Sequence, residues 1–264
     1  MRSVDSFRRA PKRPPERCLR EWGEQLSNRC GPNETQVTDE RVIDEIRERH
    51  DRLLARLREV AAANGHDPAA LRIVGITKTH PVAVARAAVA AGIARLGESR
   101  VQEAEPKVAA VPEAEWHFVG RLQSNKARRA ARTFAVIHSV DSSDLLDRLD
   151  RIAGEEARPT RLLLEVNVSG EATKGGMAPD QLRTVAAPRH ARLVGLMTIA
   201  PMDAEAAEAR AVFRRLRELR DDLAGRIGIE LPELSMGMSA DAEAAAAEGA
   251  TLVRIGTALF GPRG

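Results

Sequence analysis

Hydrophobic and polar positions alternate in a regular way from residue 39 onward. Short apolar runs are followed by longer stretches in which apolar residues recur at helical spacing. The runs predict strands at residues 71–77, 93–97, 115–120, 134–140, 161–168, 192–199, 233–236 and 251–256. The stretches between them predict helices at about 81–91, 100–110, 124–132, 142–157, 178–187, 203–224 and 240–248. Apolar strands alternating with helices are typical of βαβ units, so we expect a parallel sheet that is buried on both faces.

Eight strands are the number that closes a (β/α)8 barrel. A further amphipathic helix over 39–63, ended by Asn64-Gly65, can fill the place that the seven intervening helices leave in the outer ring. The competing doubly wound sheet needs a glycine-rich fingerprint after its first strand, and residues 76–81 (ITKTHP) contain none. We therefore predict a single α/β domain over 39–264, a (β/α)8 TIM barrel with an extra N-terminal helix.

Residues 1–38 differ from the rest in composition. They contain four prolines and no apolar period, which predicts a disordered extension. Residues 1–20 carry a net charge of +5 in a protein of +3, so the remainder is −2. A basic tail on a near-neutral body is unlike a nucleic-acid-binding domain. The arginine-rich stretch 121–132 lacks interleaved aromatic residues, and we expect it to be a solvated helix face rather than an RNA site.

Cysteine content and hydropathy limit the class of protein further. Cys18 and Cys30 both precede the barrel, which excludes a disulfide scaffold or a cysteine-based zinc site within it. No apolar run approaches the roughly 20 residues that cross a bilayer, and the first residues lack the apolar core of a signal peptide. We expect a soluble, cytoplasmic protein with neither a membrane nor a nucleic acid as its partner.

Lys78 is the strongest candidate for chemistry. Active sites of such barrels are built where the strands end, and of the five lysines only Lys78 follows directly on an apolar strand. Burial at that place disfavours the ammonium form, as a Schiff-base lysine requires. A lysine that merely extends its amine to solvent at a strand end is the ordinary alternative.

An anion site is predicted at the ends of the last two strands. Ser239 is a good N-cap for the helix at 240–248, and Gly256-Thr257 offers small residues with open backbone donors. The loops after strands seven and eight are the usual phosphate site of this fold. The ordinary alternative is a capped helix and a glycine turn.

Several polar residues are predicted to line the barrel interior. Arg254 shares its strand face with Gly256 and needs a partner there, either a ligand or an internal carboxylate such as Glu165. His117 and His138 lack metal-type spacing, so we predict polar groups of the core or pocket and no metal site.

Six segments carry a family resemblance, and they occur in family order between about 41 and 261. They are IVGITKTHP, LGESRVQE, WHFVGRLQSNKA, VNVSGEATKGG, GLMTIAP and LSMGMSADAEAAAAEGATLVRIGTALFG. The sequence resembles the pyridoxal phosphate homeostasis proteins, single-domain relatives of the alanine racemase barrel. It departs from them at Ser99, where the family usually has Asn after Gly-Glu, and in residues 1–38, which match no family segment.

The resemblance implies a fold-type III barrel that binds pyridoxal 5′-phosphate (PLP). Lys78 would form the aldimine and Arg254 would face the pyridine nitrogen. The phosphate would be held by Ser239, Gly256 and Thr257. The remaining residues assigned to the cofactor pocket are His117, Met197 and Ser235.

The resemblance also implies a monomeric carrier that buffers PLP for vitamin B6 homeostasis, with PLP-dependent apoenzymes as candidate partners. An arginine cannot protonate the ring nitrogen, and the sequence has no tyrosine to serve as a second acid/base, so strong catalysis is not expected. The alternatives are a Schiff-base lyase or isomerase acting on a phosphorylated sugar and a PLP-dependent amino-acid racemase.

Overall fold

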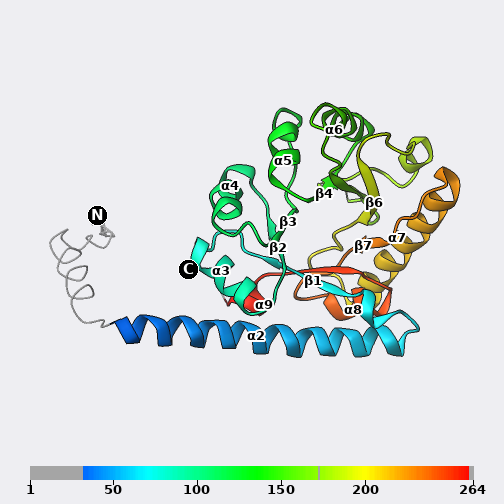
Figure 1. Cartoon of the computed structure of the whole chain (residues 1–264). Coiled ribbons are helices and arrows are strands. Elements are labelled where there is room, and N and C mark those ends of the chain that lie inside the picture. The colour runs from blue at the N-terminus through cyan, green and yellow to red at the C-terminus, as the bar shows by residue number, and fades with distance from the viewer. Residues whose placement is uncertain (1–31, 172, 262–264) are drawn as a thin grey trace, which may run out of the picture. The chain divides into compact units, whose positions relative to one another are not determined.

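Eight parallel strands form a closed barrel at the centre of the fold (Figure 1). The computed structural model describes residues 32–171 and 173–261, and all eight strands lie within these ranges. The strands are β1 (Arg72–Ile76), β2 (Arg95–Glu98), β3 (Glu115–Phe118), β4 (Val136–Val140), β5 (Arg161–Glu165), β6 (Arg192–Met197), β7 (Glu233–Ser235) and β8 (Leu252–Ile255). The barrel closes where β8 pairs with β1, with Arg254 opposite Val74. The predicted strands and the TIM-barrel class are thereby confirmed.

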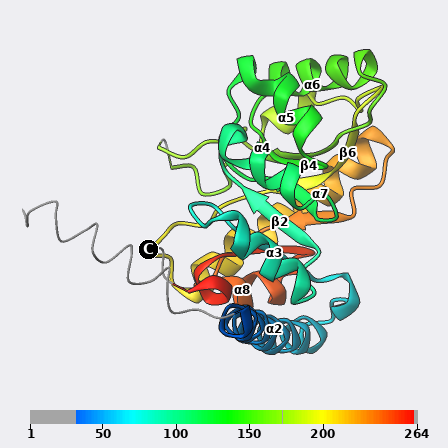
Figure 2. The same ribbon diagram turned by 60° about the vertical axis from the view of Figure 1, so that its left-hand side comes forward.

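Helices surround the strands, as the two ribbon views show (Figures 1 and 2). They are α3 (Val82–Ala90), α4 (Val101–Ala110), α5 (Ala127–Thr133), α6 (Ser143–Glu155), α7 (Ala206–Ile227), α8 (Ala242–Ala247) and α9 (Thr257–Phe260). Short 3₁₀ turns are η1 (Pro68–Ala70), η2 (Ser124–Lys126) and η3 (Gln181–Thr184). α6 illustrates why these segments are helical: the Ser142 side chain caps its first turn, and Leu145, Leu149 and Ile152 form one buried face.

The N-terminal helix α2 (Pro32–Ala63) is longer than predicted. We expected it to begin near Asp39. Residues 33–38 contain neither glycine nor proline, so the helix extends toward the N-terminus as far as Pro32, a residue that the first turn of a helix tolerates. The predicted extension 1–38 is therefore helical over 32–38, and residues 1–31 lie outside the described residues. From Ile43 onward α2 is part of the barrel unit.

Two arginine contacts join this part of α2 to the barrel. Arg47 donates to the Ala90 carbonyl at the end of α3, and Arg49 donates to the Leu259 carbonyl in α9. Leu57 and Ala61 of α2 are buried in the main hydrophobic core. The helix thus occupies the vacant place in the outer ring, as predicted.

The predicted helix at 178–187 is wrong. Only η3 forms there, because the segment lies between Pro179 and Pro188 and buries just Leu182 and Val185. Two apolar contacts over ten residues do not stabilise a longer helix.

The apolar residues fall into an outer shell and two small interior clusters. The shell packs helices against the outward faces of the strands and contains Phe118, Phe134 and Phe213. Inside the barrel, Val74, Ile76 and Leu252 form one cluster and Val136, Leu163 and Met197 form the other. Among the described residues, no helix has the length and hydropathy that crossing a membrane requires.

Candidate functional site

Lys78 lies at the carboxyl end of β1, in a tight turn that closes with a hydrogen bond from the His80 amide to the Thr77 carbonyl at 3.1 Å. Its side chain is half-buried. Thr79, next in the turn, has a φ of +68° and is one of two described non-glycine residues with positive φ. A β-branched residue is strained there, and such strain concentrates at functional sites.

A buried ion pair between α4 and β2 contacts this turn. The Lys107 ammonium of α4 donates to Glu98 Oε1 at 2.6 Å and to the Thr77 carbonyl at 2.7 Å, and the Thr77 hydroxyl donates to the same Glu98 oxygen. Glu98 is fully buried. Sequence analysis missed this pair, although the buried face of α4 (Val101, Ala104, Lys107) follows helical spacing and would have placed Lys107 inward.

Arg254 extends into the barrel interior from β8 and is only 6% exposed. Its Nη1 donates to Ser235 Oγ at 2.7 Å and its Nη2 to the Thr198 carbonyl at 3.0 Å. Burial lowers the pKa of the guanidinium to about 10, a change that the charges of Asp241 and Glu165 oppose. Glu165 was the carboxylate we considered as its partner, but the hydrogen bonds go to neutral oxygens.

His117 and His138 continue inward from Ser235. His138 Nδ1 lies 2.8 Å from Ser235 Oγ, and His138 Nε2 lies 2.7 Å from His117 Nδ1. His117 Nε2 lies 2.9 Å from Glu115 Oε1, at the amino end of β3. Both ring nitrogens of each histidine therefore face protein groups. The structure brings His117 together with Glu115, away from the strand ends that carry Lys78.

Two arginines surround Glu115. Arg161 donates to Glu115 Oε2 at 2.5 Å, and Arg95 lies 3.3 Å from Oε1. The pKa of Glu115 is held well below its usual value, first by the hydrogen bond with His117 and then by Arg161. Burial lowers the pKa of His117, and it lowers that of His138 further with help from the charges of His117 and Arg254.

The loop between β7 and α8 differs from prediction at Ser239. α8 begins at Ala242 with Asp241 at the N-cap position, and Asp241 Oδ1 accepts the Met238 amide at 2.6 Å. Serine and aspartate both serve as N-caps, and the sequence order alone did not separate them. Gly237 is required in this loop, because its φ is +91° and a Cβ would lie 2.6 Å from that of Ala245.

Gly256 and Thr257 lie beside the end of β1. Gly75 pairs with Ile255, so the residues after these two positions leave adjacent strands at the same end of the barrel. A Cβ on Gly256 would lie 3.5 Å from the Ile76 carbonyl, an ordinary contact. Thr257 begins α9, in which the amides of Leu259 and Phe260 donate to the Gly256 carbonyl, so that the amides of Thr257 and Ala258 are the ones with no acceptor within the helix. The amine of Lys78 and a set of backbone donors thus share one rim.

Met197 and Ser235 are both buried. They are opposite each other at the ends of β6 and β7, and the Met197 side chain belongs to the interior cluster with Val136 and Leu163. Ser235 is a hydrogen-bond partner of Arg254, as described above.

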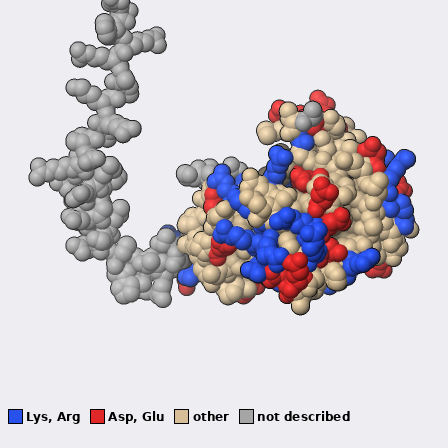
Figure 3. All heavy atoms as spheres, turned by 90° about the horizontal axis from the view of Figure 1, so that it is seen from above, with Lys and Arg blue, Asp and Glu red and all other residues tan. Residues whose placement is uncertain are grey.

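The predicted solvated face at 121–132 carries arginines that are paired with acids. Arg128 contacts Glu155 and Glu156, and Arg132 contacts Glu156 as well. Arg129 binds Glu105 of α4 at 2.5 Å. The side of the molecule that carries α5 and α6 shows acidic groups alongside the basic ones (Figure 3). These pairs favour the solvated face over a site for nucleic-acid phosphates.

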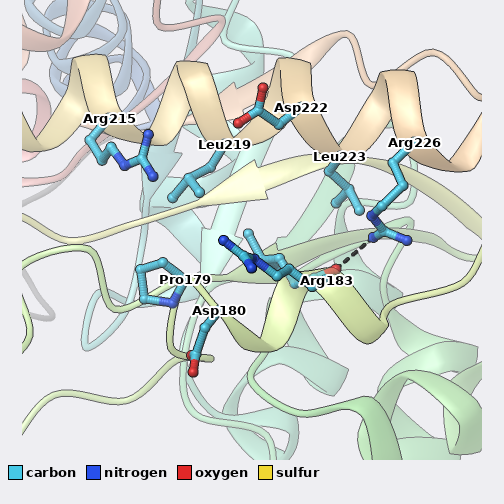
Figure 4. A pocket seen from close by; sticks show the side chains of 9 residues that line it. Pro179, Asp180, Arg183, Arg215, Leu219, Asp222, Leu223 and Arg226 are labelled. Atoms are coloured by element: carbon cyan, nitrogen blue, oxygen red, sulfur yellow. Dashed lines mark hydrogen bonds between the residues drawn. The ribbon is translucent and has the colours of Figure 1, made fainter.

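A pocket on the outside of the barrel has no comparable chemistry (Figure 4). It lies between α7 and the segment around η3. Arg226 donates to the Leu182 carbonyl there, and Arg215 pairs with Glu218. The pocket is lined by Pro179, Asp180, Leu182, Arg183, Arg215, Leu219, Asp222, Leu223 and Arg226.

Comparison with known proteins gives matches over most of this chain. The family described as alanine racemase, N-terminal domain, matches residues 50–264. The pyridoxal phosphate homeostasis protein of Pseudomonas aeruginosa is 46% identical over 83% of this chain and 96% of its own length. That of Aquifex aeolicus is 42% identical over 82% of this chain and 97% of its own.

A solved structure is similar as well. PipY of Synechococcus elongatus, determined with PLP bound, is 42% identical and has a TM-score of 0.69 over 77% of this chain and 99% of its own. The sequence identity and its coverage of both chains together show that this protein belongs to the pyridoxal phosphate homeostasis family, built on the alanine racemase N-terminal barrel.

Proposed function

We propose that this protein binds PLP at the carboxyl end of its barrel and carries and buffers it for vitamin B6 homeostasis. The observation that carries the proposal is the shared rim: the Lys78 amine at the end of β1 and the backbone donors at Gly256-Thr257 lie on adjacent strands, with Arg254 below on β8. The fit is one of chemistry, since an amine, a guanidinium and open amides match an aldehyde, a ring nitrogen and a phosphate. When bound, PLP supplies an aldehyde for reversible covalent attachment.

Each residue then has a defined task. Lys78 holds the aldehyde carbon, and Ser239, Gly256 and Thr257 hold the phosphate. Arg254 donates to the ring nitrogen. His117 is not among these contacts, because both of its ring nitrogens have protein partners. Met197 and Ser235 border the site from β6 and β7.

Arg254 also argues for a carrier rather than an efficient enzyme. A guanidinium is a donor only, so it leaves the ring nitrogen unprotonated and the ring a weak electron sink. Racemisation needs an acid/base on each face of the substrate, and the sequence contains no tyrosine to assist Lys78. We propose that the protein has no strong catalytic activity of its own.

Borohydride reduction in the presence of PLP tests the attachment. A phosphopyridoxyl group should be fixed on Lys78, and Lys78→Ala should abolish labelling while the circular dichroism spectrum is retained. Lys126→Ala removes a lysine from the end of η2, just before α5, and serves as the matched control. Labelling that persists at Lys107, Lys126 or Lys174 in the Lys78→Ala variant would overturn the assignment.

The phosphate contacts are tested by comparing two ligands. Thr257→Ala should weaken PLP binding by about 1.5–3 kcal/mol, as expected for a charge-assisted hydrogen bond, and leave unphosphorylated pyridoxal nearly unaffected. Equal weakening of both ligands would place the phosphate elsewhere. Incubation with L-alanine in deuterated water tests the carrier role, and D-alanine formed at many turnovers per second would contradict it.

A further inference from the structure

A continuous row of hydrogen-bonding side chains crosses the barrel interior. It consists of Glu115, His117, His138, Ser235 and Arg254, and the four links measure 2.9, 2.7, 2.8 and 2.7 Å in that order. All of these except Glu115 are fully buried or nearly so. We call this set the polar row. It separates the two interior apolar clusters, one on β1 and β8 and the other on β4, β5 and β6.

With both imidazoles neutral, the carboxylate at one end of the polar row determines the position of every proton in it. Glu115 lies between Arg95 and Arg161 and is therefore an acceptor only. His117 must then donate through Nε2, which leaves Nδ1 as an acceptor when the ring is neutral. His138 must consequently donate its Nε2–H to His117 and present Nδ1 to Ser235.

Arg254, at the other end, is compatible with the same order. A guanidinium can only donate, so Ser235 Oγ accepts from Arg254 Nη1, and the serine proton can be donated to His138 Nδ1. An imidazolium at His117 would instead donate through Nδ1 to His138 and make His138 a donor to Ser235, whose oxygen has a second lone pair to accept it. The tautomer of His138 therefore distinguishes the two arrangements.

We propose that the polar row positions Arg254 for the ring nitrogen of PLP, with both histidines neutral and protonated on Nε2. The identity of the ligand in this inference rests on the proposed function. The proton order does not depend on it. Glu115, His117, His138 and Ser235 are positioning residues, because they act on the ligand only through Arg254. Two of the five guanidinium N–H groups bind Ser235 and the Thr198 carbonyl, which leaves the others available to a further acceptor.

At His138 the neighbouring charges favour the neutral form, whereas at His117 the Glu115 carboxylate favours the charged form and Arg161 and Arg95 oppose it. Arg95 and Arg161 lie near His117 at the amino ends of β2 and β5, and Arg254 lies near His138. Glu115 is the carboxylate in direct contact with the row, and Glu165 and Asp241 act on it through Arg254. Burial lowers the pKa of both imidazoles, which agrees with the order derived from the contacts.

Nitrogen-15 NMR of the cofactor-free protein tests the proton order directly. Long-range proton–nitrogen correlations should show His117 and His138 as neutral Nε2–H tautomers at pH 7, with Nδ1 shifts typical of an acceptor. The signals are assigned with His117→Gln and His138→Asn. An imidazolium or an Nδ1–H tautomer at either position at pH 7 would overturn the proposal.

The positioning role is tested with two buried serines. Ser235→Ala removes the link to Arg254, whereas Ser139→Ala removes a buried hydroxyl next to His138 that has no hydrogen-bond partner within the described residues. We expect Ser235→Ala to weaken PLP binding by about tenfold or more, the value of one hydrogen bond to a charged group, and to shift the pH midpoint of the visible band of bound PLP. Ser139→Ala should change neither.

The outcomes separate this inference from the proposed function. If the unmodified protein does not bind PLP, the proposed function fails, and the tautomers still decide the proton order. If it binds PLP and Ser235→Ala matches it in affinity and pH midpoint, the positioning role is wrong. Should Ser235→Ala fail to fold, His138→Asn replaces it, because an asparagine oxygen can still accept from Ser235 while the link to His117 is lost. His138→Asn should then shift the pH midpoint of the visible band of bound PLP in the same way. An unchanged midpoint would contradict the positioning role of the polar row.

Discussion

The apolar shell and the barrel interior are built from the same strands yet contain opposite kinds of side chain. On β5, Leu162 and Leu164 point outward into the shell, and Leu163 between them points inward to a cluster of three buried residues. The shell is continuous from α2 to α9, whereas the interior is divided by the polar row. Alternate residues of a single strand thus pack against the helices on one face and form the barrel interior on the other.

This division explains how a small interior can hold an arginine and two histidines. Burying such groups costs free energy unless each has a partner, and in the polar row each has one on both sides. The shell supplies most of the hydrophobic stabilisation that offsets the remaining cost. Stability and function should therefore respond separately to substitution in the two regions.

The largest loss of stability is expected in the shell. Phe213 of α7 is fully buried, and Phe213→Ala should lower the free energy of unfolding by about 3–5 kcal/mol through lost burial and a cavity. Urea denaturation measures this. At temperatures where the variant remains folded, its affinity for PLP should be unchanged, and a parallel loss of affinity would show that the two regions are not separable.

Breaking the buried ion pair beneath Lys78 should have the next largest effect. Lys107→Met leaves the Glu98 carboxylate buried with only the Thr77 hydroxyl as its donor. Removing one member of a buried pair costs about 3–5 kcal/mol, and we expect the lower end because that hydroxyl remains. The double variant Lys107→Met with Glu98→Leu should recover much of the loss, and urea denaturation of the three proteins tests whether it does.

Acid should destabilise the protein through the two histidines. Their folded-state pKa values are lowered from 6.5, so the unfolded chain binds more protons and stability falls as the pH drops below that value. Each histidine that stays neutral in the folded protein adds a slope of at most about 1.4 kcal/mol per pH unit below that value. The pKa of Glu115 is lowered too, so its contribution is lost only at lower pH.

Replacing one histidine provides the control for this slope. Denaturation of His138→Asn at pH 7, 6 and 5 should show a smaller slope, whatever its absolute stability. An unchanged slope would mean that His138 is not neutral in the folded protein.

The smallest effect is expected at the strained turn. Thr79→Gly relieves a positive φ that disfavours a β-branched residue, at the cost of greater freedom in the unfolded chain. We expect the free energy of unfolding, measured by thermal denaturation, to rise by about 1 kcal/mol. Borohydride labelling of Lys78 with PLP should be slower, because the turn is less rigid. Ala157→Gly, at the other positive φ, is the control that should leave labelling unaltered.

The barrel of eight strands, and the end of it at which Lys78 and Gly256-Thr257 lie, could be predicted from the sequence. Parallel strands buried on both faces are short apolar runs, and their carboxyl ends meet at one end of a barrel. This reasoning placed Lys78 and Gly256-Thr257 at the carboxyl ends of β1 and β8, and the two-residue period of the strand placed Arg254 in the barrel interior. It failed where local signals were ambiguous, as at η3 and at the start of α2.

What the sequence determined by itself was local: the period of each element, the residues that end it, and the face on which a side chain lies. Only the tertiary structure decided which inward side chains meet. His138 and Ser235 are 97 residues apart, and their contact depends on the closure and stagger of the barrel, as does the contact of Lys107 with Thr77. A pattern along one strand carries no information about the register of another across the barrel. The polar row therefore became visible only once all eight strands were in place.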